Sequence, residues 1–190
     1  FFSTVFPALL RPYFRRLDKP SLPKYRGNFA LRGLKKPVTV RWDALAIPQV
    51  NAADEADLFF AQGFLHAQER LWQMELSRRF LGGRMAEIFG EFPLPWQDLS
   101  IQFRRRTSAD LDYFMRLLGI RACAEASLGL VSEELRVRLD PYAAGVNRYI
   151  EQCGKKLPCE FRLLRHRPEP WRAEDTLTIG KGFALLLSTA

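Results

Sequence analysis

The stretch DLFFAQGFLHAQERLWQMELSRRFLGGRMAEIFG, residues 57–90, predicts one long helix around which the rest of the chain is organised. Its apolar residues recur at helical spacing in two adjoining stripes, Leu58, Ala61, Leu65, Trp72 and Leu76 on one and Phe60, Phe64, Ala67, Leu71 and Met74 on the next. Two adjoining stripes make an apolar arc wider than a surface helix needs, so we expect a largely buried helix. Buried polar groups need partners, so the polar residues of this helix predict an internal network: Gln62, His66, Gln68, Glu69, Arg70, Gln73, Glu75, Arg78 and Arg79.

Local signals place the other elements. Asp54 is the expected N-cap of the long helix, which should end near Phe80 because Gly82 and Gly83 follow. Alternating apolar residues over 28–42 indicate a strand pair or hairpin, and residues 47–52 an extended segment. A short helix is expected over 84–89 and further helical structure over 97–128. The next helix should cover 132–152, with a kink or new start at Pro141. We then expect an extended or turn segment over 158–164 and a last helix over 176–187. The fold class is therefore mostly α, with a short β segment near the start.

Composition favours one ordinary globular domain, because 47% of the 190 residues are apolar and 26% are charged. The net charge of +8 raises nucleic acid, anionic lipid or an acidic chain as partners. Residues 104–106 are the only run of three basic residues, and no nucleic-acid motif accompanies them. We therefore favour a solvated basic face and expect no nucleic acid as a partner.

The first residues and the cysteines leave alternatives open. The chain begins with Phe1 and no Met, so we expect a fragment or processed product whose residues 1–26 are an N-terminal extension or the remnant of an anchor. The apolar stretch at its start is too short to span a membrane, but residues 1–16 could contact one or pack on a partner. Cys153 and Cys159 flank a turn and either form a disulfide or remain two thiols, whereas Cys123 should be a small buried residue.

The residues alone show no self-contained catalytic set. There is no Gly-x-Ser-x-Gly elbow, no phosphate-binding glycine loop and no dinucleotide fingerprint. His66 and Glu69 have the spacing of half a carboxylate-bridged metal site, but His166 is the only other histidine, so a hydrogen-bonded core histidine is the better interpretation. We predict no catalytic residue and no metal ligand in this chain.

Several segments nevertheless resemble the penicillin acylase family, in the order that the family has them. They are RWDALAIPQVNA over 41–52, the long-helix motif over 57–75, Arg78-Arg79 with GRMAE over 83–87, YAAGVNRYI over 142–150, PCEF over 158–161 and PEPW over 168–171. Ala46 departs from the glycine that the family usually has, and Gln49 from its frequent histidine. Both departures concern a turn rather than chemistry.

The resemblance implies an N-terminal-nucleophile hydrolase, made as one precursor that cleaves itself into an α and a β chain. The nucleophile is then the N-terminal serine of the β chain, whose own α-amino group is a suitable general base because such groups titrate near pH 8. Residues 27–190 would be the α chain, one domain shared with the β chain in an αββα fold. The reaction would be hydrolysis of the linear amide of N-acylated small molecules, either β-lactam side chains or N-acyl homoserine lactones. It would need no cofactor, a structural calcium would have no assignable ligand in these residues, and the location would be periplasmic, with or without membrane association.

By the same resemblance, the last helix should line the acyl pocket with Phe183, Ala184, Leu186, Leu187 and Ser188. Leu187 and Ser188 stand where some relatives that prefer aromatic acyl groups have Arg and Phe, so we expect a wide apolar pocket for an aliphatic acyl chain. The alternative is that this helix only packs. Two other function classes also remain open, a non-catalytic helical binding module and a membrane adaptor.

Overall fold

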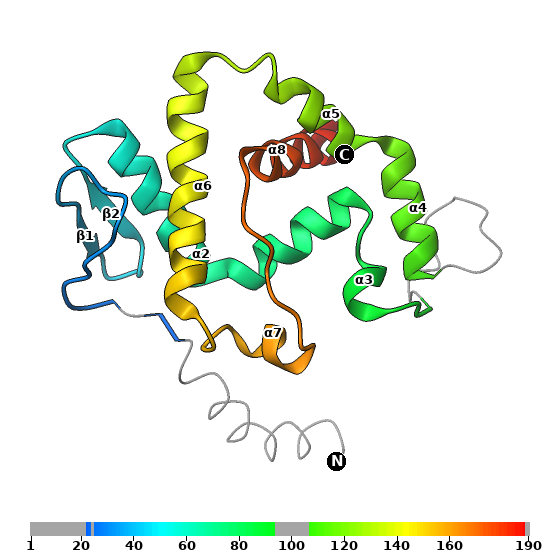
Figure 1. Cartoon of the computed structure of the whole chain (residues 1–190), viewed down its shortest axis with the longest axis horizontal. Helices are drawn as coiled ribbons and strands as arrows, with labels where there is room; N and C mark the ends of the chain where they lie inside the picture. Colours follow the sequence, from blue (N-terminus) through cyan, green and yellow to red (C-terminus); the bar gives the residue numbers. More distant parts are fainter. Residues whose placement is uncertain (1–21, 24, 94–106, 189–190) are drawn as a thin grey trace.

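The structure, a computed structural model, describes residues 22–23, 25–93 and 107–188 (Figure 1). Its elements are, in order, β1 (Thr39–Trp42), β2 (Pro48–Asn51), α2 (Glu55–Gly82), α3 (Ala86–Phe89), α4 (Ser108–Leu118), α5 (Ile120–Leu128), α6 (Glu133–Cys153), α7 (Cys159–Leu163) and α8 (Ala173–Ser188). The chain is thus mostly helical with one short two-stranded sheet, as predicted. Within these residues, no helix combines the length and the apolar character needed to cross a membrane.

Helix α2 begins and ends where the local signals predict. The Asp54 side chain accepts hydrogen bonds from the backbone N–H groups of Ala56 and Asp57, which satisfies two donors at the helix start. Gly83 ends the helix in the left-handed conformation (φ 64°), and its N–H donates to carbonyls of the last turn. Arg70 interrupts the helical geometry (φ −142°, ψ 25°), so α2 is kinked at this residue.

The core lies where α6 packs along α2. Backbone touches backbone here, because a Cβ at Gly63 would lie 2.1 Å from the carbonyl oxygen of Tyr142 and one at Gly145 would lie 1.9 Å from that of Phe60. The close approach brings together buried side chains from α2, α6, the loop that follows it, α7 and the segment before α8, namely Phe64, Ala67, Leu71, Ala143, Val146, Tyr149, Leu157, Phe161 and Trp171.

The predicted β segment is a single hairpin. Strands β1 and β2 are antiparallel, with Val40 opposite Val50, so the extended segment expected over 47–52 is the second strand. The turn holds Ala46 at φ 60°. Glycine adopts this left-handed conformation at low cost, which explains why the family usually has glycine at the position of Ala46.

Of the strand pair expected over 28–42, the part after Gly33 is confirmed as β1, but the strand expected before Gly33 is wrong. The chain turns at Gly33 (φ 110°), and the backbone N–H groups of Lys35 and Lys36 then donate to the buried Asp57 carboxylate at 2.8 and 2.9 Å. A carboxylate on α2 therefore holds this segment, and it replaces the strand partner that the alternation had suggested.

Three further expectations need correction. Residues 158–164, expected to be an extended or turn segment, contain the short helix α7, which places Cys159 and Phe161 in the core. Helix α6 continues through Pro141, so of the two alternatives expected there, a kink or a new start, the new start is wrong. Cys123 is exposed rather than buried, and no disulfide joins any of the three cysteines, all of which lie in the described residues. Residues 94–106, part of the stretch expected to be helical, lie outside the described residues.

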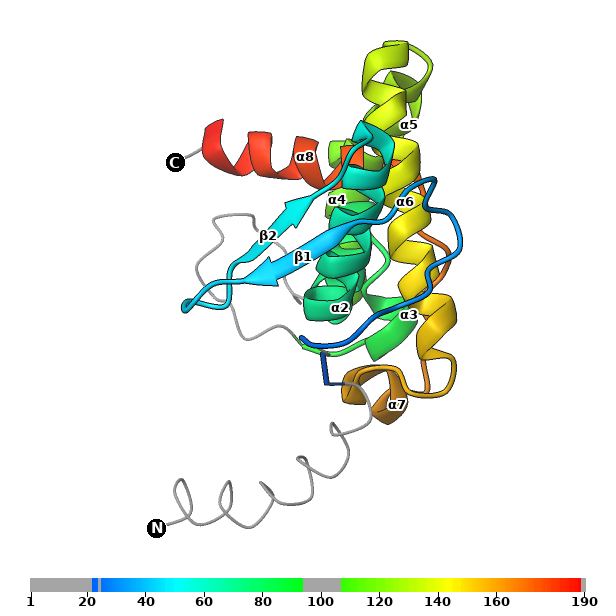
Figure 2. The ribbon, with the colours of Figure 1, turned by 90° about the vertical axis from the view of Figure 1, so that its left-hand side faces the viewer.

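Helix α8 packs against α5 and the end of α2, and its C-terminal half projects beyond the other described elements (Figure 2). The turn of the β1–β2 hairpin projects from the same side of the molecule.

Candidate functional site

The five predicted pocket residues all lie on the projecting end of α8. Every residue from 183 to 188 is exposed, and the exposed fraction reaches 61% for Phe183, 64% for Leu186 and 74% for Leu187. Ala184 and Ser188 share this end, and the Ser188 hydroxyl donates to the carbonyl of Leu185 at 2.8 Å. The structure therefore gathers the predicted residues in one apolar surface, which we call the α8 tip (residues 183–188).

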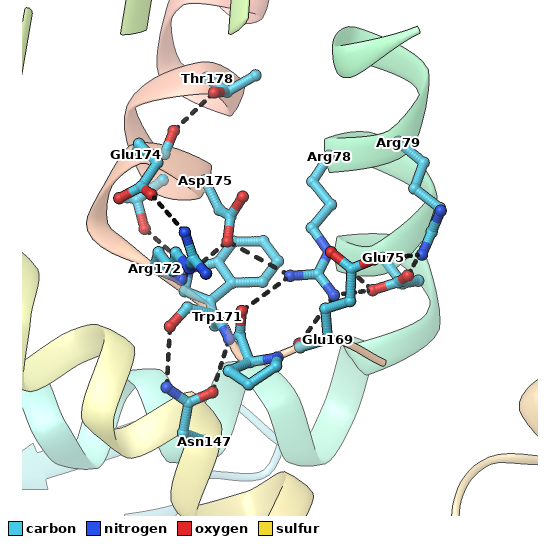
Figure 3. Close-up of polar contacts among 12 residues, drawn as sticks. Glu75, Arg78, Arg79, Asn147, Glu169, Trp171, Arg172, Glu174, Asp175 and Thr178 are labelled. Atoms are coloured by element: carbon cyan, nitrogen blue, oxygen red, sulfur yellow. Dashed lines mark hydrogen bonds and ion pairs between the residues drawn. The ribbon is translucent and has the colours of Figure 1, made fainter. Parts of the chain in front are cut away.

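The first half of α8 is held by buried polar contacts (Figure 3). The carboxylate of Asp175 accepts from the guanidinium groups of Arg78 (3.3 Å) and Arg121, and also from the backbone N–H of Arg172 at 2.8 Å. Just before the helix, Asn147 of α6 binds the backbone of Trp171 on both sides, accepting its N–H at 2.6 Å and donating to its carbonyl at 2.8 Å. Gly182, at the end of this half, lies so close to Leu81 that a Cβ would be 2.5 Å from the leucine methyl groups.

Next to Asp175 lies a second buried carboxylate, that of Glu75, whose side chain is 1% exposed. Arg78 donates to it through Nε at 2.8 Å and Arg79 through Nε at 2.6 Å, and His166 Nε2 lies 2.8 Å from its Oε1. Arg78 also donates to the carbonyl of Glu169 at 2.9 Å. Buried charges are tolerated when they are paired and hydrogen-bonded, and here the pairing joins α2 to the segment that leads into α8.

At the edge of this cluster, Arg84 binds two exposed carboxylates. It donates to Glu169 at 2.6 Å and to Glu87 at 2.8 Å, and Arg79 reaches Glu87 at 2.7 Å. The hydrogen bond from Arg84 lowers the pKa of Glu169 to about 2, and it likewise lowers the pKa of Glu87. Carboxylates with lowered pKa values remain ionised at neutral pH and are poor general acids or bases. We therefore assign a structural role to these residues, which we call the arginine–carboxylate cluster (Glu75, Arg78, Arg79, Arg84, Glu87, Glu169 and Asp175).

His66, expected to be a hydrogen-bonded core histidine, is hydrogen-bonded but exposed, so its expected place in the core is wrong. His66 Nδ1 lies 3.0 Å from the hydroxyl of Tyr142 on α6, while Glu69 accepts from Tyr25 at 3.1 Å and from Gln68 at 3.3 Å. Partial burial of the ring and the neighbouring Arg70 lower the pKa of His66, and burial raises the pKa of Tyr142 to about 12. In the described part of the chain, no group of three or more histidine, cysteine or acidic side chains is placed to hold a metal ion.

A hollow of about 420 Å³ lies between the hairpin, the preceding loop and α2. Its lining is mainly apolar, with Phe29, Leu31, Trp42 and Phe64 among the contributors, and among the described residues Tyr25 is the one titratable group that lines it. A hollow of this kind can receive an apolar group, but it offers no nucleophile or base.

The sequence predicted the α2 residues of the arginine–carboxylate cluster but not their partners. Glu75, Arg78 and Arg79 form the internal polar network predicted for the long helix. By contrast, Gln62, Arg70 and Gln73 are exposed at the surface of the described chain. The partners Asp175, His166 and Glu169 were missed, because they lie about 90 or more positions away along the chain and no local pattern links them. The PEPW motif over 168–171 was the available signal for Glu169.

The chain is similar to known acylases along most of its length. A family model described as penicillin amidase matches residues 37–190. The chain is 34% identical over 175 residues to the penicillin acylase 2 proenzyme of Pseudomonas sp. (strain SE83), which covers 92% of this chain and 20% of that protein. It is also 34% identical over 166 residues to the acyl-homoserine lactone acylase QuiP of Pseudomonas aeruginosa, covering 87% of this chain and 18% of that protein.

A solved structure shares the fold as well. A thermostable penicillin G acylase from Alcaligenes faecalis superposes with a TM-score of 0.66 at 26% identity, covering 81% of this chain and 75% of the matched chain. The chain spans about a fifth of the length of the curated relatives it matches. The family match covers far more than half of the chain and includes the residues of the arginine–carboxylate cluster. By sequence and by fold, this chain belongs to the penicillin amidase family.

Proposed function

We propose that this chain is the α-chain part of an amide-hydrolysing acylase and contributes an apolar wall to its acyl pocket. The observation that carries the proposal is the α8 tip, a run of exposed apolar residues at the end of a helix whose first half is anchored by buried ion pairs. Apolar residues exposed together in this way are typical of a surface that binds a ligand or another chain.

The partner in this proposal is a β chain from the same precursor, with its N-terminal serine as nucleophile. One relative is named a proenzyme, and this chain corresponds to only 20% of it. The chain matched in the solved penicillin G acylase is, by contrast, of about the same length as this one, since the superposition covers 75% of it and 81% of ours. Both facts support a segment that becomes a separate chain after processing. The exposed Leu45 and Ile47 of the hairpin turn lie on the side from which α8 projects, and we assign this side to the β chain.

The substrate in this proposal is an N-acylated small molecule with an aliphatic acyl group, such as an N-acyl homoserine lactone. The α8 tip offers three leucines, an alanine, Phe183 and one small hydroxyl, with no charge to pair with a polar acyl group. Burying one methylene contributes about 0.8 kcal/mol, which corresponds to about fourfold in kcat/KM for each added methylene until the pocket is full.

Acyl-length series on the complete processed protein test this proposal. We expect kcat/KM to rise from butanoyl to longer N-acyl homoserine lactones, and Leu187→Ala to lower it about tenfold for the long chains and little for butanoyl. Leu117→Ala is the matched control, because Leu117 on α4 is 70% exposed against 74% for Leu187. Rates that are independent of acyl length, or equal effects of the two substitutions, would show that α8 only packs.

Intact-mass measurement of the same preparation tests the chain organisation. We expect a second, larger chain that begins with serine, and a lone stable chain would favour a non-catalytic helical binding module instead. A periplasmic location is part of the proposal and is tested by cell fractionation. The chemistry needs no cofactor from this chain. The described residues supply no ligand set for calcium, so no step is assigned to that ion.

A further inference from the structure

The segment around α7 is strongly basic. Residues 148–167 contain six basic residues and two acidic ones, a net charge of +4 and hence half of the +8 carried by all 190 residues. The two carboxylates are those of Glu151, which pairs with Arg148 at 3.3 Å, and Glu160. The positive charge of this segment is therefore largely uncompensated from within.

Four of these cations face solvent. Lys155 and Lys156 lie in the loop before α7, and Arg165 and Arg167 follow it, and all four are exposed. None of their side chains forms an ion pair within residues 25–93 and 107–188. This contrasts with Arg78, Arg79, Arg84 and Arg121, each of which binds at least two carboxylates.

Two exposed leucines stand between these cations. Leu163 is 53% exposed and Leu164 is 37% exposed at the end of α7, directly before Arg165. Both figures place α7 and its flanking turns at one end of the molecule, and the first described residues, from Leu22 (60% exposed), begin at this same end. Exposed basic and apolar side chains thus lie together on α7 and its flanking turns, and we call this region the α7 face (Lys155, Lys156, Leu163, Leu164, Arg165 and Arg167).

The backbone of the α7 face is held in place from inside. Arg165 adopts a left-handed conformation (φ 51°), and the N–H of the following His166 returns to the carbonyl of Phe161 at 2.8 Å. The His166 ring stacks on the Phe161 ring, with centroids 5.9 Å apart, and reaches the buried Glu75. The exposed side chains are therefore presented by a fixed turn, so ordering the backbone costs little on binding.

We propose that the α7 face docks on an anionic lipid surface. Basic residues near such a surface are attracted by its negative potential, and apolar side chains beside them can enter the boundary between headgroups and acyl chains. A nucleic-acid backbone would also attract the cations but has no use for the paired leucines, and no nucleic-acid motif is present in the sequence. The proposal is independent of the acylase activity and of the α8 tip, which lies on a different element.

Co-sedimentation of the complete protein with lipid vesicles tests this inference. The probes are vesicles of phosphatidylcholine alone and vesicles containing about 30% phosphatidylglycerol, at about 0.1 M salt, where charges are partly screened. The test variant replaces the four cations of the face by glutamine: K155Q, K156Q, R165Q and R167Q. The matched control makes the same change at four exposed basic residues elsewhere: R32Q, K36Q, R41Q and R116Q. Both lower the net charge from +8 to +4.

We expect the native protein to bind the anionic vesicles and not the neutral ones. The test variant should lower the partition coefficient at least about tenfold and the control less than about threefold, because the attraction falls off within a Debye length of the surface. A second variant, L163S with L164S, should lower the part of the binding that survives high salt. Unchanged near-ultraviolet circular dichroism shows that the variants are folded, and the single charge reversal R167E replaces the fourfold variant if it is not.

Three results would overturn the proposal. Equal losses in the test and control variants would assign the binding to net charge alone. Binding that is the same for neutral and anionic vesicles, or absent from both, would remove the lipid partner. Tighter binding to duplex DNA than to anionic vesicles in the same buffer would make nucleic acid the partner.

Discussion

The two halves of α8 have opposite surroundings. The first half buries polar side chains, Asp175 and Thr178, whereas the second exposes apolar ones, Phe183 and Leu187. This reverses the usual preference of a helix in a globular protein. The buried half is stable because each polar group has a partner, such as Arg78 for Asp175 and the carbonyl of Glu174 for Thr178 at 2.6 Å. Exposed apolar residues that lie together are typical of a surface that binds a ligand or another chain, which is the role proposed for the α8 tip. One helix thus combines a buried polar anchor with an exposed apolar tip.

The largest expected effect comes from breaking the anchor. Glu75→Gln removes the charge that Arg78 and Arg79 share and leaves buried guanidinium groups without a full partner. We expect a loss of about 3–5 kcal/mol in the free energy of unfolding, measured by urea denaturation. Glu87→Gln is the control, since the Glu87 side chain is 46% exposed, and should cost about 1 kcal/mol or less. Equal losses in the free energy of unfolding for the two variants would show that the buried carboxylate contributes no more than the exposed one.

Two glycines of α8 sharpen the comparison. Gly182→Ala places a Cβ 2.5 Å from the methyl groups of Leu81, and we expect a destabilisation of about 1–3 kcal/mol because the leucine must move. A Cβ at Gly180 meets nothing within 4 Å, so Gly180→Ala should stabilise the helix by about 0.5–1 kcal/mol. The shift in melting temperature of each variant, measured by thermal unfolding, tests these two expectations. Shifts of the same sign would contradict the packing of α8 on α2.

Acid should weaken the rim of the anchor. Hydrogen bonds from Arg84 hold the pKa of Glu169 at about 2, below the ordinary 4.5, so its ionised form stabilises the fold. A lowered pKa contributes stability that is fully present above about pH 4.5 and is lost as the pH falls through 2. Because the Glu169 side chain is 50% exposed, solvent screening limits the contribution to about 1 kcal/mol or less. Urea unfolding between pH 5 and 2 should show this loss in the native protein and a smaller one in Glu169→Gln.

The smallest effect on stability is expected at the exposed half. Leu187→Ser removes an apolar side chain that is 74% exposed, so the free energy of unfolding of this chain should change by less than about 0.5 kcal/mol. A loss of several kcal/mol in the same urea assay would mean that the α8 tip is already packed within the chain. The comparison between the two halves would then fail.

Where the sequence predicted well, the determining interactions are local. Asp54 and Gly83 mark the ends of α2 through hydrogen bonds that span only a few residues, and Ser132 caps α6 in the same way. Such signals are readable because the donor, the acceptor and the backbone conformation all lie within one turn.

Where the sequence misled, a distant contact decided the outcome. Residues 28–33 alternate like a strand, yet they form none, and the Asp57 carboxylate of α2 binds the backbone N–H groups of Lys35 and Lys36 directly after them. Residues 158–164 carry a proline and were expected to be an extended or turn segment, yet they contain the helix α7, in which Phe161 packs on Trp72 with ring centroids 5.0 Å apart. Tertiary contacts override weak local preference in short segments.

The sequence by itself determined the long helix, the helical class, the family resemblance and the polar residues of α2 that must find partners. Only the tertiary structure decided which partners they find, since Asp175 and His166 lie 97 and 91 positions from the residues they bind. It also decided that α8 is divided into a buried anchor and an exposed tip. Hydrophobic periodicity shows that a face is apolar, but burial depends on what the rest of the chain brings to that face.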